Sequence, residues 1–97
     1  MSAIGKGYDI IVEDGVLDTS GQAVAVYGIN IISDGTAGDV NLRSGTAVTG
    51  DIIMTLTGTA STGVYIDLGA GVVFPTGCYV DIDAHVTPSC TLVYERI

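Results

Sequence analysis

Asp81, Asp83 and His85 form the sharpest group of chemically capable residues in the chain, at alternate positions of one segment. Alternate residues of an extended strand share a face, and carboxylate and imidazole groups are ligands for divalent cations. Same-face neighbours lie about 6.6 to 7 Å apart, so the first and third side chains are separated by about twice that distance. One ion cannot contact all three without a bend in the chain. We therefore interpret these residues as a solvated outer face and keep them only as candidate metal ligands.

The parts needed for nucleophilic catalysis are missing from the sequence. A hydrolase triad needs a base beside its nucleophile, and His85 is the single histidine. The sequence contains no Gly-x-Ser-x-Gly motif and neither glycine-rich phosphate-binding fingerprint. Asp67, Asp81 and Asp83 could supply the paired carboxylates of a glycosidase, but acids that alternate with apolar residues are typical of an exposed sheet face. The sequence predicts no enzyme, no catalytic residue and no cofactor.

Two of the five tyrosines, Tyr65 and Tyr79, stand in alternating runs that place them on a sheet surface. An aromatic ring with a polar tip suits a protein interface, and it also suits stacking on a sugar. Each tyrosine lies two positions before an acid, Asp67 or Asp81. We favour an interface and keep a carbohydrate site at these four residues as the alternative.

The composition excludes several classes of partner. The chain has 97 residues, which is enough for one small domain. Eleven Asp and Glu residues against three Lys and Arg residues give a formal net charge of −8, the wrong sign for nucleic acid or an anionic membrane. Charged residues make up 14% of the chain, below the roughly 25% of typical soluble domains. Much of the surface is therefore expected to face protein.

No targeting or membrane segment is expected in this sequence. Its first residues lack the basic and apolar regions of a secretory signal, and its longest apolar stretch, Ala23 to Ile29, is far shorter than the roughly 18 residues of a spanning helix. The sequence therefore predicts synthesis in the cytoplasm without a signal peptide. In that reducing compartment Cys78 and Cys90 are expected to be free thiols, with a disulfide between them as the alternative.

Apolar residues recur at every second position, the period of a β-strand, and the runs end in turns that contain glycine. No long segment combines a helical period with helix caps. The sequence predicts a single all-β domain over residues 1–97, an antiparallel β-sandwich or jelly-roll-like fold with almost no helix. About eight short strands are expected, near residues 8–13, 22–32, 38–43, 51–57, 63–68, 71–74, 78–83 and 90–95.

Turn-forming residues indicate how these strands connect. The Asp-Gly pairs at residues 14–15 and 34–35 are expected to form hairpins, because glycine tolerates a positive φ and aspartate bonds its own backbone. Residues 68–71 have the glycine placement of a type II′ turn, and residues 74–77 place proline where its fixed φ suits a type I turn. Residues 63–83 are therefore predicted to form a tight meander.

The last third of the chain combines a glycine-bracketed turn at 68–71, a Phe-Pro-x-Gly corner at 74–77, a Tyr-Val-Asp strand at 79–81 and a terminal Val-Tyr-Glu strand at 93–95. In this pattern the chain resembles small β-rich virion proteins of tailed bacteriophages, particularly cyanophages and marine phages. The resemblance implies a decoration or cement protein on the outer capsid surface of the virion. It also implies the major capsid protein as partner and self-association as a homodimer or homotrimer, and it supplies no catalytic residues.

The physical chemistry of a small domain agrees with such a role. A sandwich of this size gains stability when neighbours cover its strand edges and apolar faces, and few lysines are present to protect those edges. Residues 1–7 are expected to be a flexible arm, and the following segment to add a strand to a partner. The expected interface residues are Tyr8, Ile10, Ile11, Tyr65 and Tyr79. The alternative function is a carbohydrate- or receptor-binding module on a phage fibre or tail.

Overall fold

The computed structural model describes residues 7–11, 13–17, 22–59, 61–83, 86 and 89–97. These residues form strands and connections without a helix, and therefore without a helix able to cross a membrane. The strands are β1 (Gly7–Ile11), β2 (Gly15–Val16), β3 (Val24–Ile32), β4 (Gly38–Ser44), β5 (Ile52–Gly58), β6 (Val64–Phe74), β7 (Cys78–Ile82) and β8 (Ser89–Arg96). The predicted all-β class is confirmed. Since β2 has two residues, seven strands carry most of the structure.

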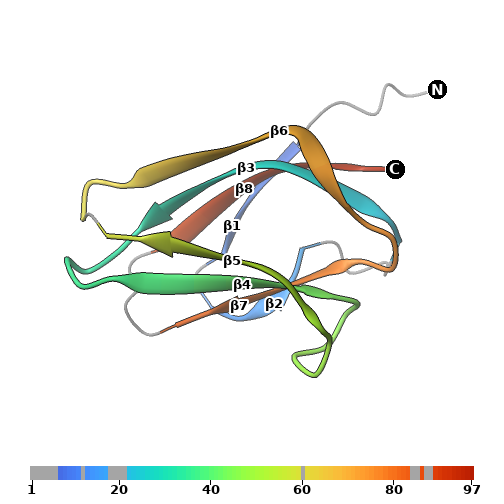
Figure 1. Cartoon of the computed structure of the whole chain (residues 1–97), viewed down its shortest axis with the longest axis horizontal. Helices are drawn as coiled ribbons and strands as arrows, with labels where there is room; N and C mark the ends of the chain where they lie inside the picture. Colours follow the sequence, from blue (N-terminus) through green and yellow to red (C-terminus); the bar gives the residue numbers. More distant parts are fainter. Residues whose placement is uncertain (1–6, 12, 18–21, 60, 84–85, 87–88) are drawn as a thin grey trace.

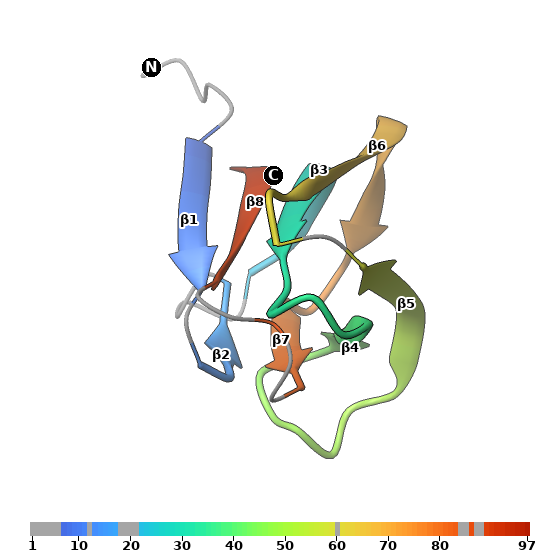
Figure 2. The same cartoon turned by 90° about the vertical axis from the view of Figure 1, so that its left-hand side faces the viewer.

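Two four-stranded antiparallel sheets pack face to face (Figure 1). Sheet A has the order β1-β8-β3-β6, and sheet B has the order β2-β7-β4-β5. The first strand pairs with the last, β2 with β7, β3 with β6 and β4 with β5, as in one long hairpin wrapped over both sheets. This is the double Greek key of a jelly roll. The predicted β-sandwich of the jelly-roll type is therefore the observed fold, and Figure 2 shows its two layers.

The two Asp-Gly turns do not make hairpins. Residues 14–15 lead from β1 of sheet A into β2 of sheet B, and residues 34–35 lead from β3 of sheet A to β4 of sheet B. Residues 75–77 also change sheets, from β6 to β7, so the predicted meander over residues 63–83 is wrong. At residues 34–35 the expected turn chemistry is present, because Gly35 has a φ of +99° and Asp34 Oδ1 accepts from the backbone N–H of Thr36. At residues 14–15 it is absent, because Gly15 belongs to β2 and Asp14 Oδ1 accepts from the backbone N–H of Ile82. A corner between sheets can use the same residue types as a hairpin.

Residues 68–71 form a bulge inside one long strand instead of the predicted type II′ turn. Both halves of β6 pair with β3, residues 64–67 on one side of the bulge and 72–74 on the other. Gly69 and Gly71 adopt φ values of +65° and +105°, which L side chains rarely adopt. A Cβ atom on Gly71 would lie 2.8 Å from the ring of Tyr27, so glycine also makes room for that ring. The nine residues of β3 are long enough to pair with both halves, which explains the single strand.

The core lies between the sheets and is built by alternation. Side chains from β3, β6 and β8 of sheet A meet side chains from β4 and β7 of sheet B. Phe74, the single phenylalanine, is fully buried at the end of β6. The buried core cluster comprises Leu17, Val24, Val26, Ile29, Ile31, Val40, Leu42, Phe74, Cys78, Val80, Val86, Cys90 and Leu92.

Candidate functional site

The outer face of sheet A carries exposed apolar side chains among polar ones. Partners in an antiparallel ladder share a face, and one row of partners crosses the whole sheet, from Ile10 through Thr91 and Asn30 to Tyr65. Ile10 is 60% exposed, Tyr65 58% and Val73 54%. We call this surface the apolar face, and its apolar members are Ile10, Ile32, Tyr65, Val73 and Val93.

Tyr65 lies across the strand next to its own. A Cβ atom on Gly28 of β3 would overlap the Tyr65 hydroxyl, and the ring carbons would also be too close. The absence of a side chain at Gly28 therefore lets the Tyr65 ring lie over β3, while Tyr65 remains 58% exposed. Gly28 thus lets an aromatic ring from the edge strand β6 lie over β3.

The acids of the apolar face are engaged within the chain. Glu95 Oε1 accepts a hydrogen bond of 2.5 Å from the Tyr27 hydroxyl. This bond raises the pKa of Tyr27 above its usual value, and desolvation and the charge of Glu95 act in the same direction. Asp67 Oδ1 accepts a bond of 2.8 Å from the backbone N–H of Gly69 at the bulge. These acids stabilise the sheet and its bulge.

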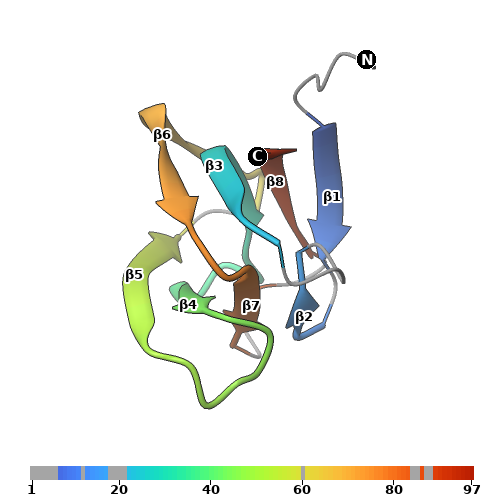
Figure 3. The ribbon, with the colours of Figure 1, turned by 90° about the vertical axis from the view of Figure 1, so that its right-hand side faces the viewer.

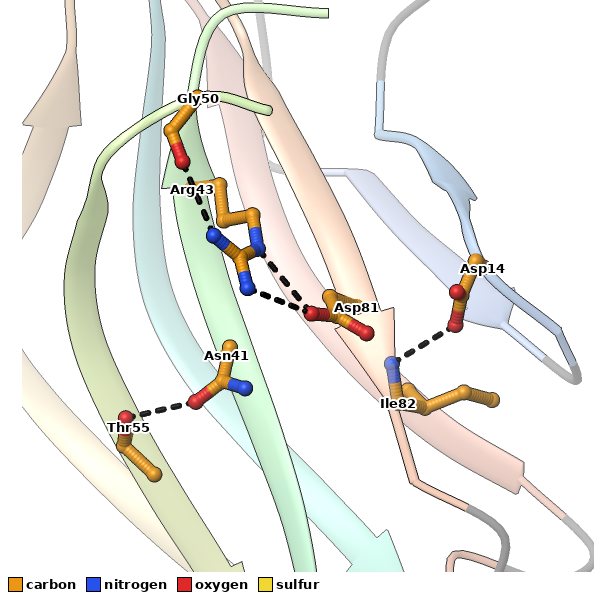
Figure 4. A network of polar contacts seen from close by, with 7 residues as sticks. All are labelled: Asp14, Asn41, Arg43, Gly50, Thr55, Asp81 and Ile82. Carbon is orange, nitrogen blue, oxygen red and sulfur yellow. Dashed lines mark hydrogen bonds and ion pairs between the residues drawn. The ribbon is translucent and has the colours of Figure 1, made fainter. Parts of the chain in front are cut away.

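The outer face of sheet B is polar, and Figure 4 shows its hydrogen bonds. Arg43 Nε and Nη2 each lie 3.0 Å from Asp81 Oδ2, and Arg43 Nη1 donates to the Gly50 carbonyl at 3.0 Å. Thr55 donates to Asn41 Oδ1 across the β4–β5 ladder. These contacts tie three of the strands of sheet B together on the side away from the core, so we call this surface the polar face.

The structure gives two members of the candidate metal group other partners. Asp81 is paired with Arg43, and Asp83 Oδ2 accepts a bond of 3.1 Å from the backbone N–H of Asp39. His85 lies outside the described residues. Among the residues that are described, no three His, Cys, Asp or Glu side chains gather as a cation site would require. Asp81 and Asp83 therefore act as structural hydrogen-bond acceptors of sheet B.

The expected interface residues divide between the two faces. Ile10 and Tyr65 share the apolar face, at its opposite edges. Tyr79 lies on β7, on the polar face, so Tyr65 with Asp67 and Tyr79 with Asp81 cannot form one carbohydrate site. Tyr8 and Ile11 belong to β1, but their side chains are outside the described part of the chain.

Strand β1 pairs with β8 of its own chain and forms one edge of sheet A, so the addition of this segment to a partner remains a prediction. Gly7 is already part of this pairing, opposite Tyr94, whereas the rest of the predicted arm, residues 1–6, lies outside the described residues. Val73 was missed as a surface residue. Its position directly before the buried Phe74 was the available signal, because neighbours on a strand face opposite sides.

Cys78 and Cys90 are free thiols in the core, on β7 and β8. Both side chains are fully buried, and desolvation raises the pKa of each thiol to about 12 from an ordinary value of 9.0. A protonated, inaccessible thiol is a poor nucleophile. The two cysteines therefore fill the space between the sheets.

We expect native protein to resist alkylation by iodoacetamide at mildly alkaline pH, and both thiols to react once denaturant unfolds it. Mass spectrometry of the alkylated chain checks this result, and modification of either thiol in the folded protein would contradict it.

The raised pKa values of the two thiols also predict that the stability of the protein depends on pH. As the pH rises, the thiols of the unfolded chain lose their protons near pH 9, before the buried thiols of the folded chain do. The free energy of unfolding is therefore expected to fall as the pH rises from about 9 toward 12. Thermal unfolding across that window measures the loss.

Comparison of the chain with protein-family models, with curated proteins and with solved structures finds no match.

Proposed function

We propose that this chain is a structural virion protein, a decoration protein that binds the outer head shell of a tailed phage and stabilises it. The observation that carries the proposal is the apolar face, where Ile10, Tyr65 and Val73 are each more than half exposed. Exposed apolar side chains that share one face of a sheet offer a surface that a protein partner can cover. The partners proposed are the major capsid protein and further copies of this chain.

The two faces suit such a position on a shell. The apolar face supplies the contact with the capsid, and the polar face, with its Asp and Thr side chains, suits water. The jelly-roll fold recurs in viral capsid and lectin domains, which supports the proposal as an analogy of fold alone. A protein that binds only the assembled shell stabilises it by mass action, and a lattice of identical sites makes attachment firm.

The experiment uses DNA-filled heads of the phage whose genome encodes this chain, prepared with and without this protein. We expect the protein to cosediment with these capsids and to raise the temperature at which they release DNA. Tyr65→Glu together with Val73→Glu should weaken binding by about tenfold or more, because aromatic anchors dominate interface energies. Equal DNA release from decorated and bare capsids would contradict the proposal.

Tyr79→Glu is the matched control, since it makes the same change on the polar face. We expect this variant to bind as well as the parent chain. Circular dichroism of all variants separates lost binding from lost folding. If Tyr79→Glu abolished binding and the Tyr65 and Val73 changes did not, the contact would lie on sheet B.

A carbohydrate- or receptor-binding module on a fibre or tail is the second candidate. It is favoured by one feature, the exposed Tyr65 ring with Asp67 two positions further along the same face. The structure limits this candidate to sheet A, because Tyr79 and Asp81 lie on sheet B. Binding on a glycan array that disappears in Tyr65→Ala would support it, and an array without a binder would exclude it.

A further inference from the structure

The two sheets have four edge strands, and they differ in how well they are protected. Sheet A ends in β1 and β6, and sheet B ends in β2 and β5. Exposed edges carry unpaired backbone N–H and C=O groups that can pair with another chain, and proteins protect them with charges, bulges or short length. Strand β2 has two residues, and β6 carries Asp67 and its central bulge. Strand β1 contains Asp9 among five residues.

Strand β5 lacks this protection. Its seven residues, Ile-Ile-Met-Thr-Leu-Thr-Gly, contain no charge and no proline. Its one irregularity, a register shift beside Ile53, lies at the start, and residues 54–58 run in regular register with β4. Ile52 and Ile53 are about half exposed, at 49% and 50%. The edge is thus long, uncharged and rich in residues that favour strands.

We propose that β5 pairs with β5 of a second copy, antiparallel across a two-fold axis at Thr55, to make one continuous eight-stranded sheet. The outer edge of β5 presents alternating backbone N–H and C=O groups, and a second antiparallel strand can form hydrogen bonds with all of them. A symmetric dimer uses the same surface on both copies, so the strand must complement itself. The sequence of β5 meets that requirement.

In the register centred on Thr55, Ile53 lies opposite Thr57 of the second copy, and Thr55 lies opposite its own equivalent. β-branched residues pair well across strands. On the inner side Met54 lies opposite Leu56 of the second copy. Met54 and Leu56 are half-buried at the β5 edge of the sandwich, where they pack against the core. The pairing therefore covers apolar surface that the single chain leaves partly exposed.

The charge distribution favours a second copy at this edge. The chain carries a net charge of −8, which opposes association wherever acids meet. No acid lies within β5, and Asp51 just before it would face Thr59 of the second copy, which is uncharged. Like charges therefore do not meet along the seam.

The dimer leaves the apolar face open. Strand β5 lies at the side of the sandwich, whereas the apolar face is the outer surface of the other sheet (Figures 2 and 3). The inference therefore goes beyond the proposed function, because it names the self-association edge and its symmetry and needs no capsid. A chain that dimerises through β5 without binding capsids would contradict the proposed function and leave this inference standing.

Charge-swapped variants test the pairing. In Thr55→Lys and in Thr55→Glu, like charges face each other across the axis, so each variant alone should dimerise about 100-fold more weakly than the parent chain. Mixed in equal amounts, the two should form a heterodimer, because opposite charges then meet. Sedimentation equilibrium measures the dissociation constants, and native mass spectrometry identifies the mixed species.

Two controls isolate the edge. Thr55→Val removes only the bond to Asn41 and should remain a dimer. Val73→Lys adds the same charge on an edge strand of sheet A and should also remain a dimer. A parent chain that is monomeric at every concentration tested would overturn the inference. Undiminished dimers of both Thr55 charge variants, or a mixture without heterodimer, would overturn it too.

Discussion

Phe74→Ala should lower the free energy of unfolding by about 3 to 5 kcal/mol, the range for a phenylalanine deleted from a core. The ring is fully buried at the last position of β6, opposite Val24, directly before the corner that carries the chain from sheet A to sheet B. Small domains have a total stability of about 5 to 15 kcal/mol. Most of the folded population is therefore expected to be lost at moderate temperature. Urea unfolding followed by circular dichroism measures the change.

Val73→Ala is the control for this substitution, because the neighbouring side chain is 54% exposed on the apolar face. It should change the free energy of unfolding by about 0.5 kcal/mol or less. Phe74→Leu should fall between the two, since it keeps most of the apolar volume. Equal effects at positions 73 and 74 would contradict the assignment of Phe74 to the core.

Gly50→Ala should be the second most damaging change, at about 1 to 3 kcal/mol, because it forces atoms into occupied space. A Cβ atom at this position would overlap the carbonyl oxygen of Ser44 and lie 3.3 Å from that of Ala47. Backbone cannot rotate aside as a side chain can, so the β4–β5 connection must shift. Because the Gly50 carbonyl accepts a bond from Arg43, the shift also disturbs the pair of Arg43 and Asp81.

Gly7→Ala is the matched control, because a Cβ atom on Gly7 would meet nothing within 4 Å. Alanine loses less backbone freedom on folding than glycine does, so this variant should be neutral or slightly stabilised. Thermal unfolding of both variants compares them, and amide hydrogen exchange along β4 and β5 locates the damage. A Gly50→Ala variant as stable as the parent chain would show that the connection adapts without cost.

The alternation of the sequence was a sound guide to the faces of the strands. In β6 it distinguished the outward Tyr65 from the inward Ile66, and in β4 the buried Val40 and Leu42 alternate with Asn41. The reason is local, because successive side chains of any strand point to opposite sides. The sandwich class and the exposed position of Tyr65 could be predicted on this basis.

The sheet to which each strand belongs was much harder to predict. An Asp-Gly turn reverses the chain equally well within one sheet or between two, so the chemistry of residues 34–35 could not show that β4 joins the other sheet. Glycine with a positive φ occurs both in turns and in bulges, so the residue types at Gly69 and Gly71 could not distinguish the two. Only the length of β3, which pairs with both halves of β6, decides that these residues continue one strand.

The candidate site shows the same division. Tyr65 and Tyr79 have equivalent local patterns, yet they lie on different sheets, because β6 and β7 separate at the corner after Phe74. Ile10 and Tyr65, far apart in the sequence, share a face through the ladder of β1, β8, β3 and β6. The unprotected edge of β5 could be read in its uncharged residues, but not that β5 lies at an edge.

The sequence by itself determined the all-β class, the inner and outer sides of most strands, and an acidic chain with few charged residues. Those properties depend on residue type and on a period of two, which are local. The tertiary structure alone decided the jelly-roll order, the contrast between the apolar and polar faces, and which strands are edges. These depend on pairings between residues such as Gly7 and Tyr94, nearly the full chain apart. Such pairings reflect how both sheets bury their inner faces together, which no single segment encodes.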